Sequence, residues 1–170
     1  VYRQGDKIWL FGFSRGAWAA RSLGAFIVRT GLIADVDATE NGAADLAEKI
    51  WLDYKEDRGK KRGGRFWRHH DETPIRLIGV FDTVGEFGVP EFNGLRMADR
   101  DELRFLKFAD RDLSKRVENG RQALAIDERR ADFMPTLWTE REGIRQVWFA
   151  GAHADIGGGY EECGLSDIAL

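Results

Sequence analysis

The chain has 170 residues, of which 43% are hydrophobic and 32% charged, with a formal net charge of -3 at pH 7. This composition predicts one soluble globular domain, and the acidic balance argues against nucleic acid as a partner, because such domains are usually basic. The single cysteine, Cys163, excludes an intrachain disulfide and a cysteine-rich zinc site, and is interpreted as a buried or bystander thiol. No apolar run reaches membrane-spanning length, and the first residues do not resemble a signal peptide.

The first predicted elements are a strand and a helix. Residues 7–13 (KIWLFGF) form a near-continuous apolar run, typical of a parallel strand covered on both faces. Residues 17–28 change to helical spacing, and Gly31 is expected to end this helix. The expected buried side chains are Leu23, Phe26 and Ile27, and the small residues expected to approach the sheet are Gly16, Ala17 and Ala20.

A G-x-S-x-G pattern joins these two elements. Gly12, Ser14 and Gly16 predict a nucleophile elbow, a strained turn whose flanking glycines avoid a collision with neighbouring backbone. The turn would expose the Ser14 hydroxyl and leave the Arg15 amide at a helix N-terminus, where it can donate to an oxyanion. The alternative is a tight Gly-Ser turn in an α/β domain without catalytic function.

Residues 31–73 form a polar excursion. Apolar side chains at three- and four-residue spacing predict an amphipathic helix over residues 43–57: Leu46, Ile50, Trp51 and Tyr54. Residues 58–70 (RGKKRGGRFWRHH) predict a solvated basic loop. The alternative is peripheral contact with a membrane, in which this loop meets anionic phospholipid headgroups and Phe66 and Trp67 act as interfacial anchors.

A second buried strand is predicted over residues 75–81 (IRLIGVF), and Asp82 follows it directly. A carboxylate at the carboxyl end of a parallel strand lies where α/β proteins build their sites, so Asp82 is the candidate acid. The alternative is a turn-forming aspartate that caps the next segment. Residues 86–116 are polar and irregular and are interpreted as lid or substrate-contact elements.

The next segment is predicted to contain a helix over residues 113–126, bent near Gly120. The charged cluster at residues 127–130 (DERR) either takes part in catalysis or forms an ion-pair network, and the network is the favoured interpretation. Residues 143–150 (GIRQVWFA) predict a third strand, which leads to His153 and a glycine run. The end of the chain, from Gly164, predicts the start of a helix with Ser166 as its N-cap.

Ser14, Asp82 and His153 follow one another in the order expected of an α/β-hydrolase triad. Ser14 would attack an acyl carbonyl, His153 would take and return the proton, and Asp82 would orient the imidazole. Asp155, two residues from His153, is the competing acid. His69 and His70 lie in the basic loop and are expected to be solvated; with Asp71 they lack metal-ligand spacing, so neither a metal nor a cofactor is predicted.

Four blocks of sequence carry a family resemblance. They are GFSRGA at 12–17, GVFDTVG at 79–85, ALAIDERR at 123–130 and VWFAGAHADIGGGY at 147–160. Together they resemble a domain of unknown function shared by type VI secretion phospholipase effectors. The resemblance implies an α/β-hydrolase fold, with a mostly parallel sheet flanked by helices. It also implies roles for Ser14, Asp82 and His153 as nucleophile, acid and base.

The resemblance further implies an N-terminal strand and an Asp-Gly-Thr-type loop that donates the second oxyanion hydrogen bond. Because this chain lacks that segment, it is interpreted as a partial catalytic domain, residues 1–170, with residues 31–73 and 86–116 as polar excursions or lid-like insertions. Removal of one such donor typically costs a factor of about 100 to 1000 in rate.

The leading hypothesis is a serine hydrolase that cleaves acyl esters of lipids, a phospholipase A-type effector. The alternatives are an esterase for small soluble substrates and a non-catalytic interaction module of α/β-hydrolase type. The expected partners are a lipid or other acyl-ester substrate and, for an effector, a secretion-apparatus or immunity protein. The absence of a signal peptide fits a protein that is cytoplasmic as synthesised and exported as an effector.

Overall fold

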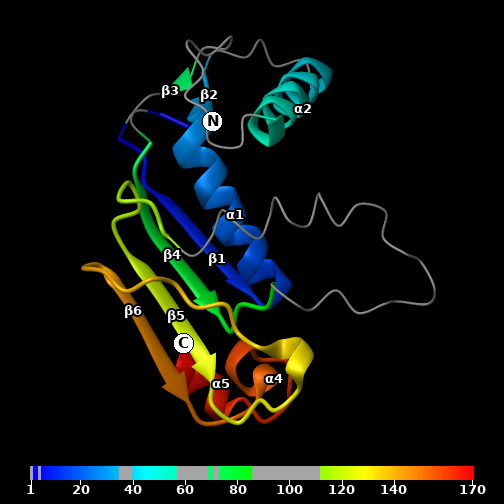
Figure 1. The fold of residues 1–170 in the computed structure, drawn as a ribbon, viewed down its shortest axis with the longest axis vertical. Coiled ribbons are helices and arrows are strands. Elements are labelled where there is room, and N and C mark those ends of the chain that lie inside the picture. Colours follow the sequence, from blue (N-terminus) through cyan, green and yellow to red (C-terminus); the bar gives the residue numbers. More distant parts are fainter. Residues whose placement is uncertain (1, 4, 35–39, 57–68, 71–72, 86–111) are drawn as a thin grey trace, which may run out of the picture.

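The computed structural model describes residues 2–3, 5–34, 40–56, 69–70, 73–85 and 112–170. Its centre is a sheet in which every pair of neighbouring strands is parallel, in the order β1-β4-β5-β6 (Figure 1). These strands are β1 (Ile8–Phe13), β4 (Ile75–Phe81), β5 (Gly120–Ala125) and β6 (Ile144–Phe149). The parallel register brings the carboxyl ends of all four strands to one edge, so residues that follow the strands are neighbours.

Helix α1 (Arg15–Thr30) packs across β1 and β4. Ala17 and Ala20 are buried against the sheet, and a Cβ on Gly24 would lie 2.5 Å from Ile78 Cδ1, so Gly24 makes the close approach. Leu23 is 47% exposed, so its predicted burial is wrong. The helix ends as predicted at Gly31, which has φ 73 and donates its N–H to the Ile27 carbonyl.

The other face of the sheet carries a second, smaller apolar cluster near the carboxyl edge. It contains Ala123, Ala125, Ile156 and Ala169, with Phe81 and Phe149 packed against it. Ile156 and Ala169 come from α4 (His153–Gly157) and α5 (Gly164–Ala169), which lie beside the ends of β5 and β6 (Figure 1). The predicted helix at Gly164 is confirmed, but it follows Cys163 rather than a Ser166 N-cap.

The prediction that the first strand is covered on both faces is wrong for β1. Trp9 and Phe11 are 53% and 62% exposed, whereas their neighbours Ile8 and Leu10 pack against the main core. A strand with one exposed face can still be continuously apolar, and the apolar run therefore identified the strand correctly and its environment incorrectly.

The segment between α1 and β4 contains α2 (Glu40–Glu56) and a two-stranded antiparallel sheet of β2 (Leu32–Ile33) and β3 (His69–His70). The predicted amphipathic helix is confirmed, because Ile50 is buried and the rings of Trp51 and Tyr54 contact the Phe26 ring of α1. The distances between ring centroids are 5.6 Å for Trp51 and 5.1 Å for Tyr54. His69 and His70 are half-buried strand residues, so the prediction that they are solvated is wrong.

Strand β5 corrects the helix predicted over residues 113–126. Its residues pair with β4 on one side and β6 on the other, and an adjacent 3-10 helix, η1, spans Ala131–Phe133. A short apolar run such as ALA does not distinguish a strand from a helix, and the two flanking strands decide the outcome through their backbone hydrogen bonds. Residues 58–68 of the predicted basic loop (58–70) and residues 86–111 of the lid-like segment (86–116) lie outside the described residues.

Candidate active site

Ser14 stands between β1 and α1 in the left-handed region of backbone conformation, with φ 57. The turn is held against the end of β4, because Ser14 N–H donates to the Phe81 carbonyl at 3.0 Å and Val84 N–H donates to the Ser14 carbonyl at 3.4 Å. A Cβ on Gly12 would overlap the Gly16 carbonyl oxygen, so Gly12 meets the steric demand of the elbow. Gly16 does not, since a Cβ there would meet nothing within 4 Å outside its own helix.

Asp82 follows β4 and is fully buried, with φ 41. Its Oδ1 accepts the Ala125 N–H at 3.1 Å, and its Oδ2 lies 2.7 Å from His153 Nδ1. A buried carboxylate is costly unless it is paired and hydrogen-bonded, and here both oxygens have partners. The structure therefore joins the predicted acid to the predicted base.

His153 begins α4, and its side chain is buried. The imidazole contacts two aromatic rings, with centroid distances of 4.5 Å to the Phe13 ring and 4.7 Å to the Phe133 ring. When Nδ1 carries the proton donated to Asp82, Nε2 is the basic nitrogen. Because Phe13 directly precedes Ser14, this ring contact places the imidazole beside the elbow.

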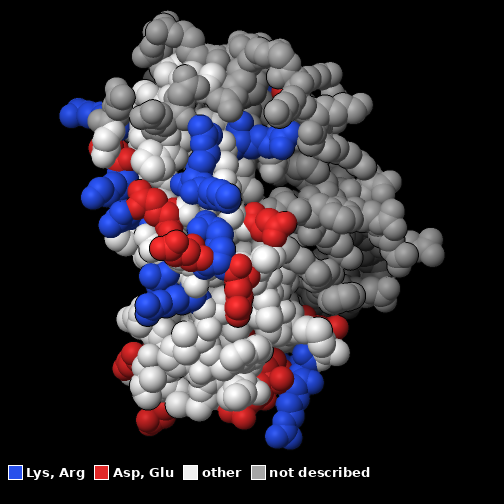
Figure 2. All heavy atoms as spheres, turned by 60° about the vertical axis from the view of Figure 1, so that its left-hand side comes forward, with Lys and Arg blue, Asp and Glu red and all other residues white. Residues whose placement is uncertain are grey.

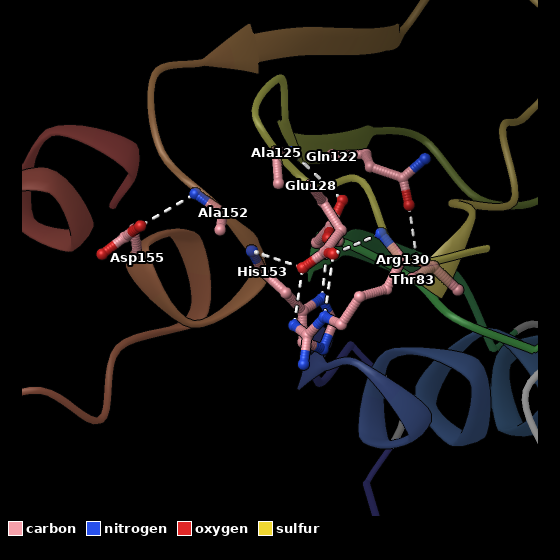
Figure 3. Close-up of polar contacts among 9 residues, drawn as sticks. Thr83, Gln122, Ala125, Glu128, Arg130, Ala152, His153 and Asp155 are labelled. Atoms are coloured by element: carbon pink, nitrogen blue, oxygen red, sulfur yellow. Dashed lines mark hydrogen bonds and ion pairs between the residues drawn. The ribbon is translucent and has the colours of Figure 1, made fainter. Parts of the chain in front are cut away.

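The remaining predicted residues are related to this pair in different ways. Arg15 is the first residue of α1, and its role as oxyanion donor stays a prediction. Within the described part of the chain, the Ser14 hydroxyl makes no hydrogen bond. Asp155 Oδ2 accepts the Ala152 N–H at 2.8 Å (Figure 3), so this carboxylate supports the histidine loop, residues 150–153. The ring of His153 is contacted by Asp82 instead.

The charged cluster after β5 contacts the histidine loop. This contact was not predicted from the sequence. Glu128 forms the predicted ion pair with Arg130, at 2.9 Å from Nε and 2.6 Å from Nη2 (Figure 3). The hydrogen bond from the Arg130 side chain lowers the pKa of Glu128 to about 2. The His153 N–H also donates to Glu128 at 3.3 Å, and the Gly151 N–H donates to Asp127 at 2.8 Å. No local signal in the sequence indicated these contacts, because the segment directly before the acids was predicted to contain a helix and not the strand β5.

A buried polar network includes Thr83, the residue that follows Asp82. Arg21, which is 1% exposed, donates to the Thr136 carbonyl at 2.6 Å and to Gln122 Oε1 at 3.3 Å, and its guanidinium lies over the Trp138 ring. Gln122 Oε1 also accepts the Thr83 hydroxyl (Figure 3). The hydrogen bond to Gln122 holds the side chain of Thr83, the residue next to Asp82.

The described residues contain no group of three or more His, Cys, Asp or Glu side chains that could hold a metal ion. Among the helices that the structure describes, none combines the length and the apolar character needed to cross a membrane. On the face seen in Figure 2, the described basic and acidic side chains are interspersed.

The fold and the paired acid and histidine define an α/β domain with a candidate hydrolytic site at the carboxyl edge of its parallel sheet. All of the chain, residues 1–170, matches the family model described as "T6SS, Phospholipase effector Tle1-like, catalytic domain". The chain therefore belongs to this family of catalytic domains from phospholipase effectors of the type VI secretion system. The resemblance inferred from the four sequence blocks is confirmed, as is the α/β fold with a mostly parallel sheet flanked by helices.

A curated relative is the uncharacterized protein YEL023C of Saccharomyces cerevisiae, 28% identical over 161 residues, which are 86% of this chain and 21% of that protein. An uncharacterized protein from Pseudomonas aeruginosa has a similar crystal structure, with a TM-score of 0.53, 21% identity, and coverage of 96% of this chain and 22% of its own. The Tle1 effector bound to the VgrG spike has a TM-score of 0.47, 24% identity, and coverage of 93% and 25%. The chain thus spans about a fifth of the length of the curated relative that it matches.

Proposed function

We propose that this chain is the catalytic part of a serine hydrolase that cleaves acyl esters of lipids, a phospholipase A-type enzyme, with Ser14 as nucleophile, His153 as base and Asp82 as acid. The observation that carries the proposal is the 2.7 Å contact between Asp82 and His153 beside the strained turn at Ser14. Membership of a family of phospholipase effector domains supports a lipid substrate.

In the proposed reaction, the Ser14 hydroxyl attacks the ester carbonyl while His153 Nε2 takes its proton. The imidazolium is stabilised by Asp82, which keeps the Nδ1 proton in place. The Arg15 amide donates a hydrogen bond to the oxyanion, and the tetrahedral intermediate collapses as His153 protonates the leaving alcohol. Water then hydrolyses the acyl-enzyme by the same steps, which regenerates the Ser14 hydroxyl and releases the fatty acid.

The experiment that tests the proposal is fluorophosphonate labelling of the full-length parent protein. We expect labelling of the wild type, and none of Ser14→Ala or His153→Ala. Two variants are matched controls. Ser166→Ala changes a serine of α5 whose hydroxyl donates to the Cys163 carbonyl, and His70→Ala changes a histidine of β3. Both controls should label like the wild type. Absence of labelling in a folded parent protein would overturn the triad and favour a non-catalytic interaction module.

The substrate class is tested by competition and by turnover. Phospholipid vesicles should suppress labelling, and activity should rise sharply when the substrate forms micelles or vesicles. Efficient turnover of short-chain soluble esters, without such a rise, would instead identify an esterase for small substrates. The basic segment at 58–70 is the proposed site of peripheral membrane contact.

We also propose that the full-length protein is an effector that is synthesised in the cytoplasm and exported. Membership of a family of type VI secretion effector domains supports a partner from the secretion apparatus. An immunity protein in the producing cell is the second proposed partner. Co-purification of the full-length protein with a VgrG-type spike tests the first of these.

A further inference from the structure

Three consecutive backbone N–H groups lead into His153, and each donates to a carboxylate. The Gly151 N–H bonds Asp127 at 2.8 Å, the Ala152 N–H bonds Asp155 at 2.8 Å and the His153 N–H bonds Glu128 at 3.3 Å. Asp155 belongs to α4 itself, whereas Asp127 and Glu128 follow β5. The two acids after β5 therefore attach the histidine loop to a different strand of the sheet.

The same stretch of chain after β5 also contacts the acid. The Ala125 N–H donates to Asp82 Oδ1, and the Ile126 N–H donates to the Phe149 carbonyl at the end of β6. Four consecutive residues, 125–128, thus contact Asp82 on one side and the loop of His153 on the other. The relative position of the two partners in the 2.7 Å contact depends on this segment.

Of these two acids, Glu128 has the side chain that its surroundings restrict more. Its side chain is 5% exposed, and Arg130 binds both of its carboxylate oxygens. The Arg130 guanidinium lies over the Phe133 ring at 3.8 Å, and that ring contacts the imidazole of His153. Glu128 therefore reaches His153 by two routes, directly through the backbone N–H and indirectly through Arg130 and Phe133.

We propose that Glu128, assisted by Asp127, is a positioning residue for His153. The two carboxylates act by accepting hydrogen bonds from backbone N–H groups of the histidine loop. The inference rests on the proposed function, since it assigns Glu128 a role in presenting the base. Gly151 has φ 114, and Gly157, Gly158 and Gly159 follow within a few residues, so the backbone around His153 has few intrinsic restrictions. A loop of this kind needs external hydrogen bonds to hold a catalytic side chain in place.

The test compares two variants that differ in the hydrogen-bond acceptor. Glu128→Leu removes the acceptor, and Glu128→Gln keeps one oxygen for the His153 N–H while it removes the charge. In the full-length protein, we expect Glu128→Leu to lower the maximal rate of fluorophosphonate labelling about 10- to 100-fold. The probe concentration that gives half of the maximal rate should change little. Glu128→Gln should recover most of that loss. Matched controls are Glu118→Leu and Glu118→Gln, because Glu118 pairs with Arg76 at the opposite end of the sheet.

The second measurement does not depend on catalysis. The hydrogen-bonded Nδ1 proton of His153 should give a downfield signal in the proton NMR spectrum, assigned by its loss in His153→Ala. We expect this signal to be lost or broadened in Glu128→Leu and kept in Glu128→Gln.

Wild-type labelling and an unchanged signal in folded Glu128→Leu would overturn the inference. So would equal damage in both variants, because the ion pair with Arg130 would then explain the effect. If the wild type itself does not label, the proposed function fails, and the NMR comparison alone decides the positioning role.

Discussion

At the scale of single residues, the site depends on two backbone conformations that residues other than glycine rarely adopt. Ser14 and Asp82 both have positive φ, at 57° and 41°, and they are the residues with this property among the described non-glycine positions. Such conformations cost of order 1–3 kcal/mol each and persist only where surrounding contacts hold them. Here the contacts are the hydrogen bonds that join the ends of β1, β4 and β5.

The two glycines of the G-x-S-x-G pattern should respond differently to alanine. Gly12→Ala places a methyl group on the Gly16 carbonyl, so we expect a loss of about 1–3 kcal/mol in the free energy of unfolding. Gly16→Ala has open space and should change stability by less than about 1 kcal/mol. Urea denaturation of the two variants checks this, and equal losses would contradict it.

Asp82→Asn should lower the labelling rate of Ser14 by about a thousandfold or more while the fold is retained. The asparagine carbonyl can accept the Ala125 N–H, and asparagine tolerates positive φ, but the amide cannot stabilise an imidazolium. Circular dichroism verifies the fold, and fluorophosphonate kinetics measure the rate. A rate within tenfold of the wild type would show that Asp82 caps the turn without acting as the acid.

The lowered pKa of the Glu128 carboxyl group predicts how the stability of the protein depends on pH. Its pKa is lowered from 4.5 to about 2, chiefly by the hydrogen bond from Arg130. Above its unfolded pKa this carboxylate therefore contributes stability, which is lost as the pH falls through the folded pKa. Between about pH 5 and pH 2, the urea midpoint of the wild type should fall more steeply than that of Glu128→Gln. Parallel curves would contradict the assignment.

At the scale of elements, the position of the elbow depends on how closely α1 approaches β4. Ala17, Ala20 and Gly24 present little side chain to the sheet, and Ile75 and Ile78 fill the space beneath them. Because α1 begins directly after Ser14, any displacement of the helix is transmitted to the turn.

The contact between Gly24 and Ile78 can be tested by a double-mutant cycle. Gly24→Ala should cost about 1–3 kcal/mol, because its Cβ would lie 2.5 Å from Ile78 Cδ1. Ile78→Val alone should cost about 0.5–1.5 kcal/mol. Since valine lacks the δ-methyl group, the double variant should lose less than the sum of the two. Strict additivity in thermal or urea denaturation would show that α1 does not contact β4 at this point.

At the scale of the whole molecule, one face of the sheet carries an exposed apolar surface. Phe11, Leu77 and Val147 line a groove of about 340 Å³ there, together with Phe149 and Leu170. Apolar surface of this kind commonly marks a contact region.

The 170-residue chain should therefore bind the dye ANS through this face. The double variant Phe11→Ser, Val147→Ser should show clearly lower dye fluorescence than the wild type at equal concentration. Leu23→Ser is the matched control, because Leu23 is 47% exposed on α1. Equal fluorescence of the wild type and the double variant would place the dye elsewhere.

Local patterns in the sequence were enough to predict strands β1, β4 and β6, helices α1 and α2 and the turn at Ser14. Each of these has a signal within a few residues: an apolar run, a helical spacing, or a glycine where the chain turns. The order of Ser14, Asp82 and His153 predicted which side chains would meet. The structure shows the contact between Asp82 and His153, and the contact between Ser14 and His153 stays a prediction.

Contacts between distant segments decided the rest. Residues 120–125 became a strand because β4 and β6 pair with them from both sides, an interaction that no local pattern encodes. Trp9 and Phe11 are exposed because burial depends on what packs on a face, whereas hydrophobicity only favours it. The attachment of His153 to Asp127 and Glu128 likewise exists only because parallel register brings the ends of β5 and β6 together.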